Sequence, residues 1–347
     1  MKKNSILRSI AVIMVLVVVM ISAVACGGKS ESSNETTADT NVADEVGSST
    51  AEETKTNSAD ETGDSKGKVA YLAGHLTNEF TLQMADNAEQ AAEECGYELV
   101  VFNGDWDLNT HLSQIENACA QGYVAIILDS IATEGYEGVL DSVVAEANIP
   151  FICVSSPING AYTSHVGCDF TTAAKLNMEA CAEFLDGSGN IAILAGTDGV
   201  LITEQEYEGY ESVLEQYPDI NIVFEGTADF SADKATNLVE NWISSGKEID
   251  GIVSMNDGMA LGARSVLVAN DLDGEVFLCG LDCTSEAREA IRQGEMQCSI
   301  LVDSLAYMRS SFDIIEKFYA GEDYSQEVSI EPILITAENI DEYFPED

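Results

Sequence analysis

Basic residues are scarce in this chain of 347 residues, in which 15 Lys and Arg stand against 61 Asp and Glu, a formal net charge of −46. A protein this acidic repels phosphate backbones and anionic lipid, so the composition argues against nucleic-acid binding. The length suits two domains, on a prior of roughly 100–200 residues per domain. With 46% hydrophobic residues, the chain has ample apolar content for real cores.

Catalytic and metal-binding motifs are also lacking. The sequence has no phosphate-loop Lys motif and no nucleophile-elbow Ser motif. The Gly-Ser-Gly at residues 187–189 precedes an apolar run instead of following one, so we interpret it as a turn and not as a dinucleotide-binding loop. Cys279 and Cys283 are four residues apart with no second pair, which argues against a zinc site. We expect no catalytic residue, no cofactor and no metal.

The first 25 residues have the order of an export signal. Basic residues precede an apolar stretch at residues 10–19, and Ala-Val-Ala at 23–25 stands directly before Cys26. The apolar stretch is short for a membrane anchor and ends in a cleavable pattern. A Cys after the small residues resembles a bacterial lipoprotein signal, which implies that residues 1–25 are removed and that Cys26 carries the lipid.

The segment after Cys26 lacks the residues that build a core. Residues 27–66 contain no aromatic residue, Leu, Ile or Met, and many Ser, Thr, Glu and Asp. Such a stretch cannot bury enough apolar surface to offset the cost of ordering its backbone. We therefore expect residues 26–67 to be a disordered acidic tether between the cell membrane and an extracytoplasmic body that starts near Lys68.

Nine Cys are present, of which eight follow Cys26. An exported protein could pair them, but their connectivity does not follow from spacing. Cys153, Cys279 and Cys298 lie in apolar runs, where Cys behaves as a small hydrophobic residue. We favour mostly free, buried thiols.

Short apolar runs recur along the body. They begin at residues 69, 99, 124 and 151, and again at 191, 220, 251 and 276. Starts roughly 25–30 residues apart are typical of βα units, and the intervening segments, such as residues 134–147 and 204–216, show helical periodicity. Apolar strands alternating with helices indicate parallel sheets covered on both faces. We predict an α/β protein with two doubly wound parallel-sheet lobes of four strands each.

Ligands of such sheets bind outside the carboxyl ends of the strands. The residues that follow the apolar runs are polar and acidic, with interleaved aromatics and almost no cations. This composition fits a neutral polyol or a cationic small molecule better than a phosphate. Of the three histidines, His75 stands at a strand end within reach of a ligand, whereas His111 is expected on an exposed helix face.

Five stretches carry a family resemblance, in the order VAYLAGHLTNEF, GYELVVFNGDWDLNTHLSQIENACAQGYVAIIL, ANIPFICV, IVSMNDGMALGA and VFLCGLDCTSEAREAIRQGEMQCSI. From Lys68 to about Thr336 the chain resembles the type I (ribose- and galactose-type) periplasmic sugar-binding proteins of ABC importers. The resemblance implies a type I periplasmic binding protein fold with three hinge crossings, near residues 168–169, 302–303 and 331–332. The lobes would be residues 68–168 plus 303–331 and residues 169–302 plus 332–347.

The resemblance also implies ligand contacts. Asn78 and Phe80 match positions that touch sugar, and Phe230 matches the aromatic residue of the opposite lobe. Asn256 and Asp282 match a hydrogen-bonding pair at second-lobe strand ends. Aromatic rings suit the C–H faces of a sugar, and amides and carboxylates suit its hydroxyls. The alternatives are core positions for the two phenylalanines and simple helix caps for Asn256 and Asp282, and a cap is compatible with ligand contact.

At several positions the sequence departs from the family pattern, and these departures bear on which ligand is bound. Ser155 and Ser156 replace the Asp-Arg pair of ribose-type members, Glu204 replaces an Arg, Asp129 replaces an Asn, and residues 302–303 replace a Gln. Two cationic groups are lost and carboxylates are gained, so ribose is not carried over. A ligand with positive charge or only donor groups, such as an amino-sugar or amine-bearing polyol, would compensate these carboxylates.

Within the stretch at residues 255–263 we assign Asn256 to the ligand and Asp257 to the helix cap or the hinge, and expect Gly262 to permit close helix approach.

These observations favour a monomeric, lipid-anchored solute-binding protein that delivers a sugar, polyol or amino-sugar to an ABC permease. The alternative is a ligand-sensing partner of a membrane chemoreceptor or histidine kinase. A transcription-repressor effector domain shares the fold, but the leader and tether stand where DNA-binding helices would be. An enzyme is the weakest rival.

Overall fold

The computed structural model describes residues 65–345. The predicted signal peptide, the lipidated Cys26 and nearly all of the predicted tether lie outside the described residues. Within residues 65–345, no helix is long and apolar enough to cross a membrane.

The described chain forms two sheets of six strands each. The first is entirely parallel and has the order β11-β5-β4-β3-β1-β2. The second has the order β12-β10-β9-β8-β6-β7, with β12 antiparallel to β10. The strands of the first sheet are β1 (Lys68–Ala73), β2 (Glu98–Asn103), β3 (Ala125–Asp129), β4 (Phe151–Val154), β5 (Ser164–Cys168) and β11 (Glu327–Ile330). Those of the second are β6 (Ser188–Ala195), β7 (Asp219–Thr227), β8 (Gly251–Ser254), β9 (Phe277–Asp282), β10 (Cys298–Leu301) and β12 (Ile333–Thr336).

The predicted α/β class is confirmed, but the prediction of four strands in each lobe was wrong. The strands that it missed are β5, β10, β11 and β12. Strands β5 and β12 follow another strand without a helix between them, so a spacing of roughly 25–30 residues does not reveal them.

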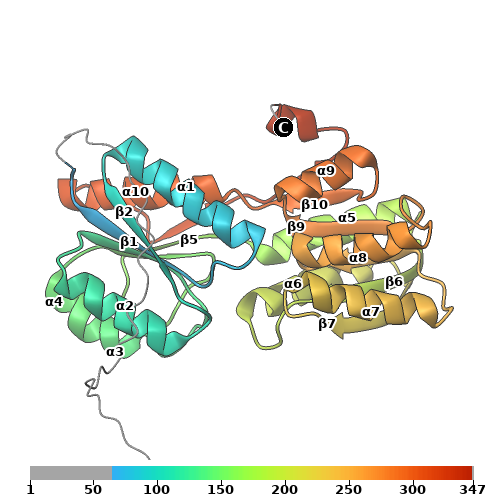
Figure 1. The fold of residues 1–347 in the computed structure, drawn as a ribbon, viewed down its shortest axis with the longest axis horizontal. Helices are drawn as coiled ribbons and strands as arrows, with labels where there is room; N and C mark the ends of the chain where they lie inside the picture. The colour runs from blue at the N-terminus through green and yellow to red at the C-terminus, as the bar shows by residue number, and fades with distance from the viewer. Residues whose placement is uncertain (1–64, 346–347) are drawn as a thin grey trace, which may run out of the picture. The chain divides into compact units, whose positions relative to one another are not determined.

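Helices cover both faces of the first sheet (Figure 1). α1 (Glu79–Cys95) and α10 (Ser304–Ala320) lie on one face, and α2 (Leu108–Ala120) lies on the other with α3 (Glu137–Val139), a π-helical turn (Leu140–Val144) and α4 (Ala145–Ala147). The helix predicted over residues 134–147 is therefore present as a continuous helical segment over residues 137–147 that contains a π-helical turn. Alternate residues of β1 serve opposite cores, because Val69 and Tyr71 pack with α1 and α10 while Ala70 and Leu72 pack with α2. We call this sheet and its helices the first lobe.

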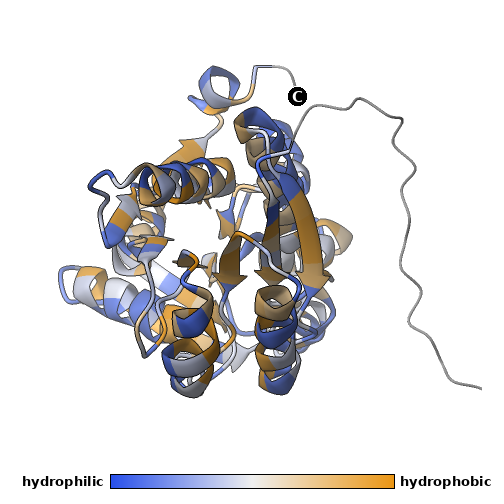
Figure 2. Cartoon of the chain, turned by 90° about the vertical axis from the view of Figure 1, so that its left-hand side faces the viewer, coloured by the Kyte–Doolittle hydropathy of each residue, from blue (hydrophilic) through white to orange (hydrophobic). Residues whose placement is uncertain are grey.

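The second sheet is covered in the same way, and with its helices forms the second lobe. Its helices are α5 (Phe170–Phe184), α6 (Leu201–Leu214), α7 (Ala232–Ser244), α8 (Asp257–Ala269), α9 (Ser285–Gln293) and α11 (Ile340–Tyr343). Figure 2, in which the first lobe faces the viewer, shows mainly hydrophobic strands between helices that carry both hydrophilic and hydrophobic residues. Helices α7 and α8 meet at Gly262, where a Cβ would lie 2.4 Å from the Ala232 carbonyl oxygen. The predicted close approach at Gly262 is confirmed.

Most of the helices that follow a strand begin at a side-chain cap. In each case a side-chain oxygen accepts a hydrogen bond from the backbone N–H three residues further on, which satisfies a donor that the helix leaves unpaired. Because parallel strands end at the same edge of the sheet, the caps gather there. The capping residues next to a strand end are Asn78, Asp107, Asp169, Ser231, Asn256, Thr284 and Asp303.

The buried cysteines agree with the interpretation of mostly free thiols. Cys153, Cys181, Cys279 and Cys298 are buried free thiols in the cores.

Candidate ligand-binding cleft

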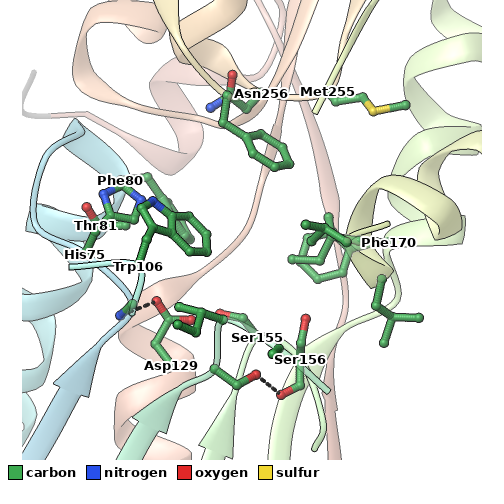
Figure 3. Close-up of a pocket in the computed structure, with 18 of the residues that line it drawn as sticks. His75, Phe80, Thr81, Trp106, Asp129, Ser155, Ser156, Phe170, Met255 and Asn256 are labelled. Carbon is green, nitrogen blue, oxygen red and sulfur yellow. Dashed lines mark hydrogen bonds between the residues drawn. The ribbon is translucent and has the colours of Figure 1, made fainter. Parts of the chain in front are cut away.

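A cavity of about 490 Å³ lies between the carboxyl ends of the strands of the two lobes. Most of the residues predicted from the sequence line it (Figure 3). Those that the structure brings together are His75, Asn78, Phe80, Asp129, Ser155, Ser156, Phe230, Asn256 and Asp282. An adjoining pocket, which shares Trp106 and Phe230 with this cavity and extends to Asp229 and Glu286, is called the mouth. Glu204 lines neither the cavity nor the mouth, because it is exposed on α6.

Trp106 contributes the largest ring on the first-lobe side, together with His75 and Phe80 (Figure 3). Asp105 and Trp106 have φ of 55° and 54°, a left-handed pair that turns the indole toward the cavity. The backbone N–H of Trp106 donates to the Gly74 carbonyl at 3.0 Å, and the indole ring stacks on His75 with centroids 4.8 Å apart. Trp106 is 53% exposed, so its ring is available to a ligand.

His75 is a neutral group in this arrangement. The Thr77 N–H donates to its Nδ1 at 3.3 Å, and the Thr77 hydroxyl lies 2.6 Å from the same nitrogen. Burial lowers the pKa of His75 below its usual value. Nδ1 therefore acts as an acceptor, and the ring proton resides on Nε2.

Phe230 occupies the matching loop of the second lobe. Asp229 and Phe230 have φ of 51° and 55°, as in the Asp105–Trp106 pair. The ring lies against Gly196, where a Cβ would approach it to 2.2 Å. Both loops follow the edge strand next to the first strand of their sheet, β2 or β7. Trp106 was not predicted as a site residue, although comparing the Asp-aromatic pairs of the two loops would have revealed it.

Asn256 caps α8, and Asp257 does not. The Asn256 Oδ1 accepts the Met259 N–H at 2.9 Å, which leaves its amide Nδ2 at the cavity surface. Asp257 instead accepts the Thr284 N–H and the Ser299 hydroxyl, each at 2.7 Å, and so connects α8 to the segment after β9 and to β10. Of the two alternatives for Asp257, the helix cap is wrong, because its side chain turns inward to these donors and its neighbour Asn256 is the cap.

Two carboxyl groups lie at strand ends on opposite sides of the cavity. Asp129 of the first lobe accepts the Gly74 N–H at 3.4 Å, and burial raises the pKa of Asp129 to about 6. Asp282 of the second lobe is 8% exposed and has φ of 117°. Burial, and then the carboxylates of Asp257 and Glu206, raise the pKa of Asp282 well above its usual value. Thr284, and not Asp282, caps the following helix α9.

Ser155 and Ser156 stand where β4 ends. Ser155 has φ of 65°, and its buried hydroxyl has no hydrogen-bond partner among the described residues. The Ser156 carbonyl accepts the Ser130 hydroxyl at 2.9 Å (Figure 3). These residues provide small polar groups on the first-lobe side of the cavity.

His111 is buried, with 0% of its surface exposed. Its Nδ1 lies 2.9 Å from the Tyr136 hydroxyl and its Nε2 lies 3.1 Å from the Ala73 carbonyl. The expectation of an exposed helix face was wrong, because the ring fills the space beside Gly104, where a Cβ would lie 2.0 Å from Nε2.

Apolar side chains that the sequence did not indicate complete the lining. Phe170 lies opposite Trp106 (Figure 3), and Met255 precedes Asn256. Phe170 is the first residue of α5 and is 4% exposed. It directly follows the predicted crossing at residues 168–169, which places it at the cavity. Among residues 65–345, no group of three or more His, Cys, Asp or Glu is arranged to hold a metal ion.

Two α/β lobes with a cleft at their strand ends define a class of proteins that bind small solutes. The comparisons agree, since the family model described as periplasmic binding protein domain matches residues 69–323. The chain belongs to this family, whose members are extracytoplasmic binding proteins.

Named relatives and solved structures cover most of the chain. It is similar to a xylitol-binding protein of Mycolicibacterium smegmatis, with 28% identity over 266 residues, 76% of each protein. It is also similar to a ribose import binding protein of Haemophilus influenzae, with 29% identity over 67% of this chain and 78% of the other. A solute-binding protein from Bacillus halodurans with bound myo-inositol matches with a TM-score of 0.75, 29% identity and coverage of 83% of this chain and 100% of that chain. A solute-binding protein from Actinobacillus succinogenes with bound D-allose matches with a TM-score of 0.76 and 26% identity, and the match covers 80% of this chain and 100% of that chain.

Proposed function

We propose that this protein is the solute-binding component of an ABC importer and captures a sugar or sugar-like polyol between its lobes. One observation carries the proposal, namely that each lobe contributes an aromatic ring and polar strand-end groups to one cavity of about 490 Å³. This volume lies within the roughly 300–1,000 Å³ of small-molecule sites. The relatives named for xylitol and ribose and the structures that hold myo-inositol and D-allose support a ligand of this class.

Within this proposal His75, Asn78, Phe80, Asp129, Ser155, Ser156, Phe230, Asn256 and Asp282 contact the ligand, and Trp106 joins them. The rings stack on the apolar face of the ligand, while amide, hydroxyl and carboxyl groups bind its hydroxyls. The protein performs no catalysis and needs no cofactor, because binding and release are the whole of its task.

The proposal includes the organisation of the chain. The lobes consist of residues 68–168 with 303–331 and residues 169–302 with 332–347, a division supported by the sheet to which each strand belongs. The protein acts as a monomer outside the cytoplasm, and a lipid on Cys26 holds it at the cell membrane through the tether of residues 26–67.

The proposed function is tested by searching for a ligand that binds the purified protein. Freshly purified protein is examined by native mass spectrometry for a co-purified small molecule, and thermal unfolding is then measured with a panel of sugars and polyols. A ligand at 100 times its Kd adds about 2.7 kcal/mol to the free energy of unfolding. No bound molecule and no stabilisation by any member of the panel would contradict the proposed function.

The lipid anchor has a separate test. Cells producing the full chain are labelled with a fatty acid, and the wild type is compared with Cys26→Ser. We expect label and membrane attachment in the wild type only. Equal membrane attachment of both proteins without label would contradict anchoring through Cys26.

A further inference from the structure

The charged side chains of the cleft are uniformly acidic. Asp129, Glu134 and Asp282 line the cavity, and no Lys or Arg of residues 65–345 lines it or its mouth. At the mouth, Asp229 is already paired with Lys234 at 2.5 Å. The interior carboxyl groups have no such neighbour, so a ligand that enters the cavity meets negative charge that the protein has not neutralised.

Asp282 is the group that most needs a partner. It is 8% exposed, it lines both the cavity and the mouth, and its carboxyl group accepts no hydrogen bond from the part of the chain that the structure describes. The titratable groups that face it are Asp257 of α8, Glu206 of α6, Glu79 of α1 and Tyr307 of α10, none of which is a cation. A buried carboxyl group without a partner is costly, and the open side of Asp282 is the cavity.

The other carboxyl groups near Asp282 are already occupied. Asp257 accepts two hydrogen bonds, from Thr284 and Ser299. The Oε2 of Glu206 accepts one from the Tyr210 hydroxyl at 3.1 Å, and its Oε1 has no partner among the described residues, but Glu206 does not line the cavity. Glu79 accepts the Ser285 N–H at 2.8 Å. Asp282 therefore differs from its neighbours, since only its carboxyl group combines burial, a place in the cavity wall and no partner within the described residues.

We propose that the ligand of this cleft carries a protonated amine, and that Asp282 is its anionic partner, with Asp129 on the opposite lobe as the second carboxyl group. This inference rests on the proposed function and names the class of ligand, an amine-bearing sugar or polyol. A neutral polyol can donate hydroxyl hydrogen bonds to Asp282, but it leaves the negative charge of the site uncompensated. A cation in the same place makes a charge-assisted hydrogen bond in a partly desolvated cavity, where such bonds are strongest.

Amine binding is linked to proton release. Burial raises the pKa of Asp282, so this carboxyl group binds a proton more tightly than an exposed one does, and a bound ammonium group favours the carboxylate. Binding of an amine is therefore expected to release protons to the buffer. A neutral polyol does not favour the carboxylate in this way.

The test uses matched pairs of ligands on the wild-type protein. Calorimetric titration at pH 6.5 compares D-glucosamine with D-glucose and N-acetyl-D-glucosamine, and an inosamine with myo-inositol, in two buffers of different ionisation enthalpy. We expect the amine of at least one pair to bind at least 10-fold more tightly than its neutral partner and to release protons on binding.

The two proposals fail differently. Neutral members that bind as tightly as their amines, without proton release, would overturn the inference and leave the proposed function standing. Binding by neither class would overturn the proposed function and the inference together.

Variants test whether Asp282 is the carboxyl group that binds the ammonium group of the ligand. Asp282→Asn is expected to abolish the preference for the amine, so that the amine and its neutral partner bind this variant with similar affinity. It should fold well, because it removes a buried carboxyl group that has no partner among the described residues. Glu208→Gln, which removes an exposed carboxylate of α6 outside the cleft, is the matched control and should keep the preference. An amine preference that survives Asp282→Asn would overturn the assignment, and the wild-type proton release tests the proposal independently of either variant.

Discussion

At the residue scale, Asn256 combines two tasks, the helix cap and the ligand contact, which the sequence analysis considered compatible. Its Oδ1 accepts the Met259 N–H at the start of α8, and its Nδ2 remains at the cavity wall. The amide group makes this possible, because one side-chain atom accepts and another donates. The capping task and the binding task can therefore be separated by substitution.

We predict that Asn256→Ser keeps stability and loses binding, whereas Asn256→Ala loses both. Ser is a comparable helix cap, while Ala removes the cap and lowers the free energy of unfolding by about 1 kcal/mol. Neither substitute offers the amide donors. Chemical denaturation and ligand titration of both variants provide the measurement, and unchanged ligand affinity in Asn256→Ser would show that the amide does not contact the ligand.

Trp106 is a second residue whose role can be isolated. Because it is 53% exposed, Trp106→Ala should change stability little but weaken ligand binding about 10-fold through the loss of a stacking face. Tyr343→Ala removes another exposed aromatic residue, 42% exposed and outside the cleft, and should bind as the wild type does. Equal affinity of the Trp106 variant and this control would exclude a stacking role.

At the scale of elements, the contact between α7 and α8 fixes the position of two cleft loops. Phe230 immediately precedes the cap of α7, and Asn256 caps α8. The two helices approach closely where Gly262 faces Ala232, so the placement of Phe230 and Asn256 relative to each other depends on a residue outside the cleft.

We predict opposite effects of Ala at two glycines of α8. Gly262→Ala should lower the free energy of unfolding by about 1–3 kcal/mol, because its Cβ would lie 2.4 Å from the Ala232 carbonyl oxygen. At Gly258 the nearest atom to a Cβ is 3.5 Å away, so Gly258→Ala should be neutral or stabilise by up to about 1 kcal/mol. Denaturant titration of the two variants gives the comparison, and a stable Gly262→Ala protein would contradict the packing argument.

At the scale of the whole molecule, the burial of cleft carboxyl groups links stability to pH. The pKa of Asp129 is raised from 3.8 to about 6 in the folded protein, so the folded state binds a proton more tightly than the unfolded chain. The stability that this group contributes is fully present below about pH 4 and is lost as the pH rises through about 6. Full loss amounts to at most about 3 kcal/mol, and to less here because Asp129 is only partly buried.

Asp129→Asn should therefore gain stability relative to the wild type as the pH rises from 4.5 to 7.5. Burial lowers the pKa of His75 and His111, which acts in the opposite direction, but these groups are present in both proteins and cancel in the difference. The measurement is Tm of both proteins without ligand at several pH values. A difference in Tm that does not change with pH would contradict the raised pKa.

The prediction of a fold from the sequence depended on local patterns. Apolar runs at regular spacing indicated β1 to β4 and β6 to β9, since each of these strands except β4 is followed by a helix that covers one face of the sheet. The short strands β5, β10, β11 and β12 escaped because they complete each sheet next to the crossings, where that spacing breaks down.

The site was predicted to the extent that it follows from topology. Parallel strands end at one edge, so polar residues after the strands had to lie near one another, and Asp129, Asn256 and Asp282 do line one cavity. Residues on helices and in loops were harder to place. Glu204 and Glu206 are two residues apart on α6, yet the first is exposed and the second buried, because the packing of that helix decides which side chain faces inward.

The sequence by itself determined the α/β class, the order of the main strands and the acidic, cation-poor character of the strand ends. The tertiary structure decided that Trp106 faces the cleft, that His111 fills a core and that Asp282 is buried with no partner among the described residues. The physical reason is that periodicity and strand-end position are properties of neighbours in the chain. The orientation of a ring or the pairing of a carboxyl group depends on side chains that folding brings together from distant parts of it.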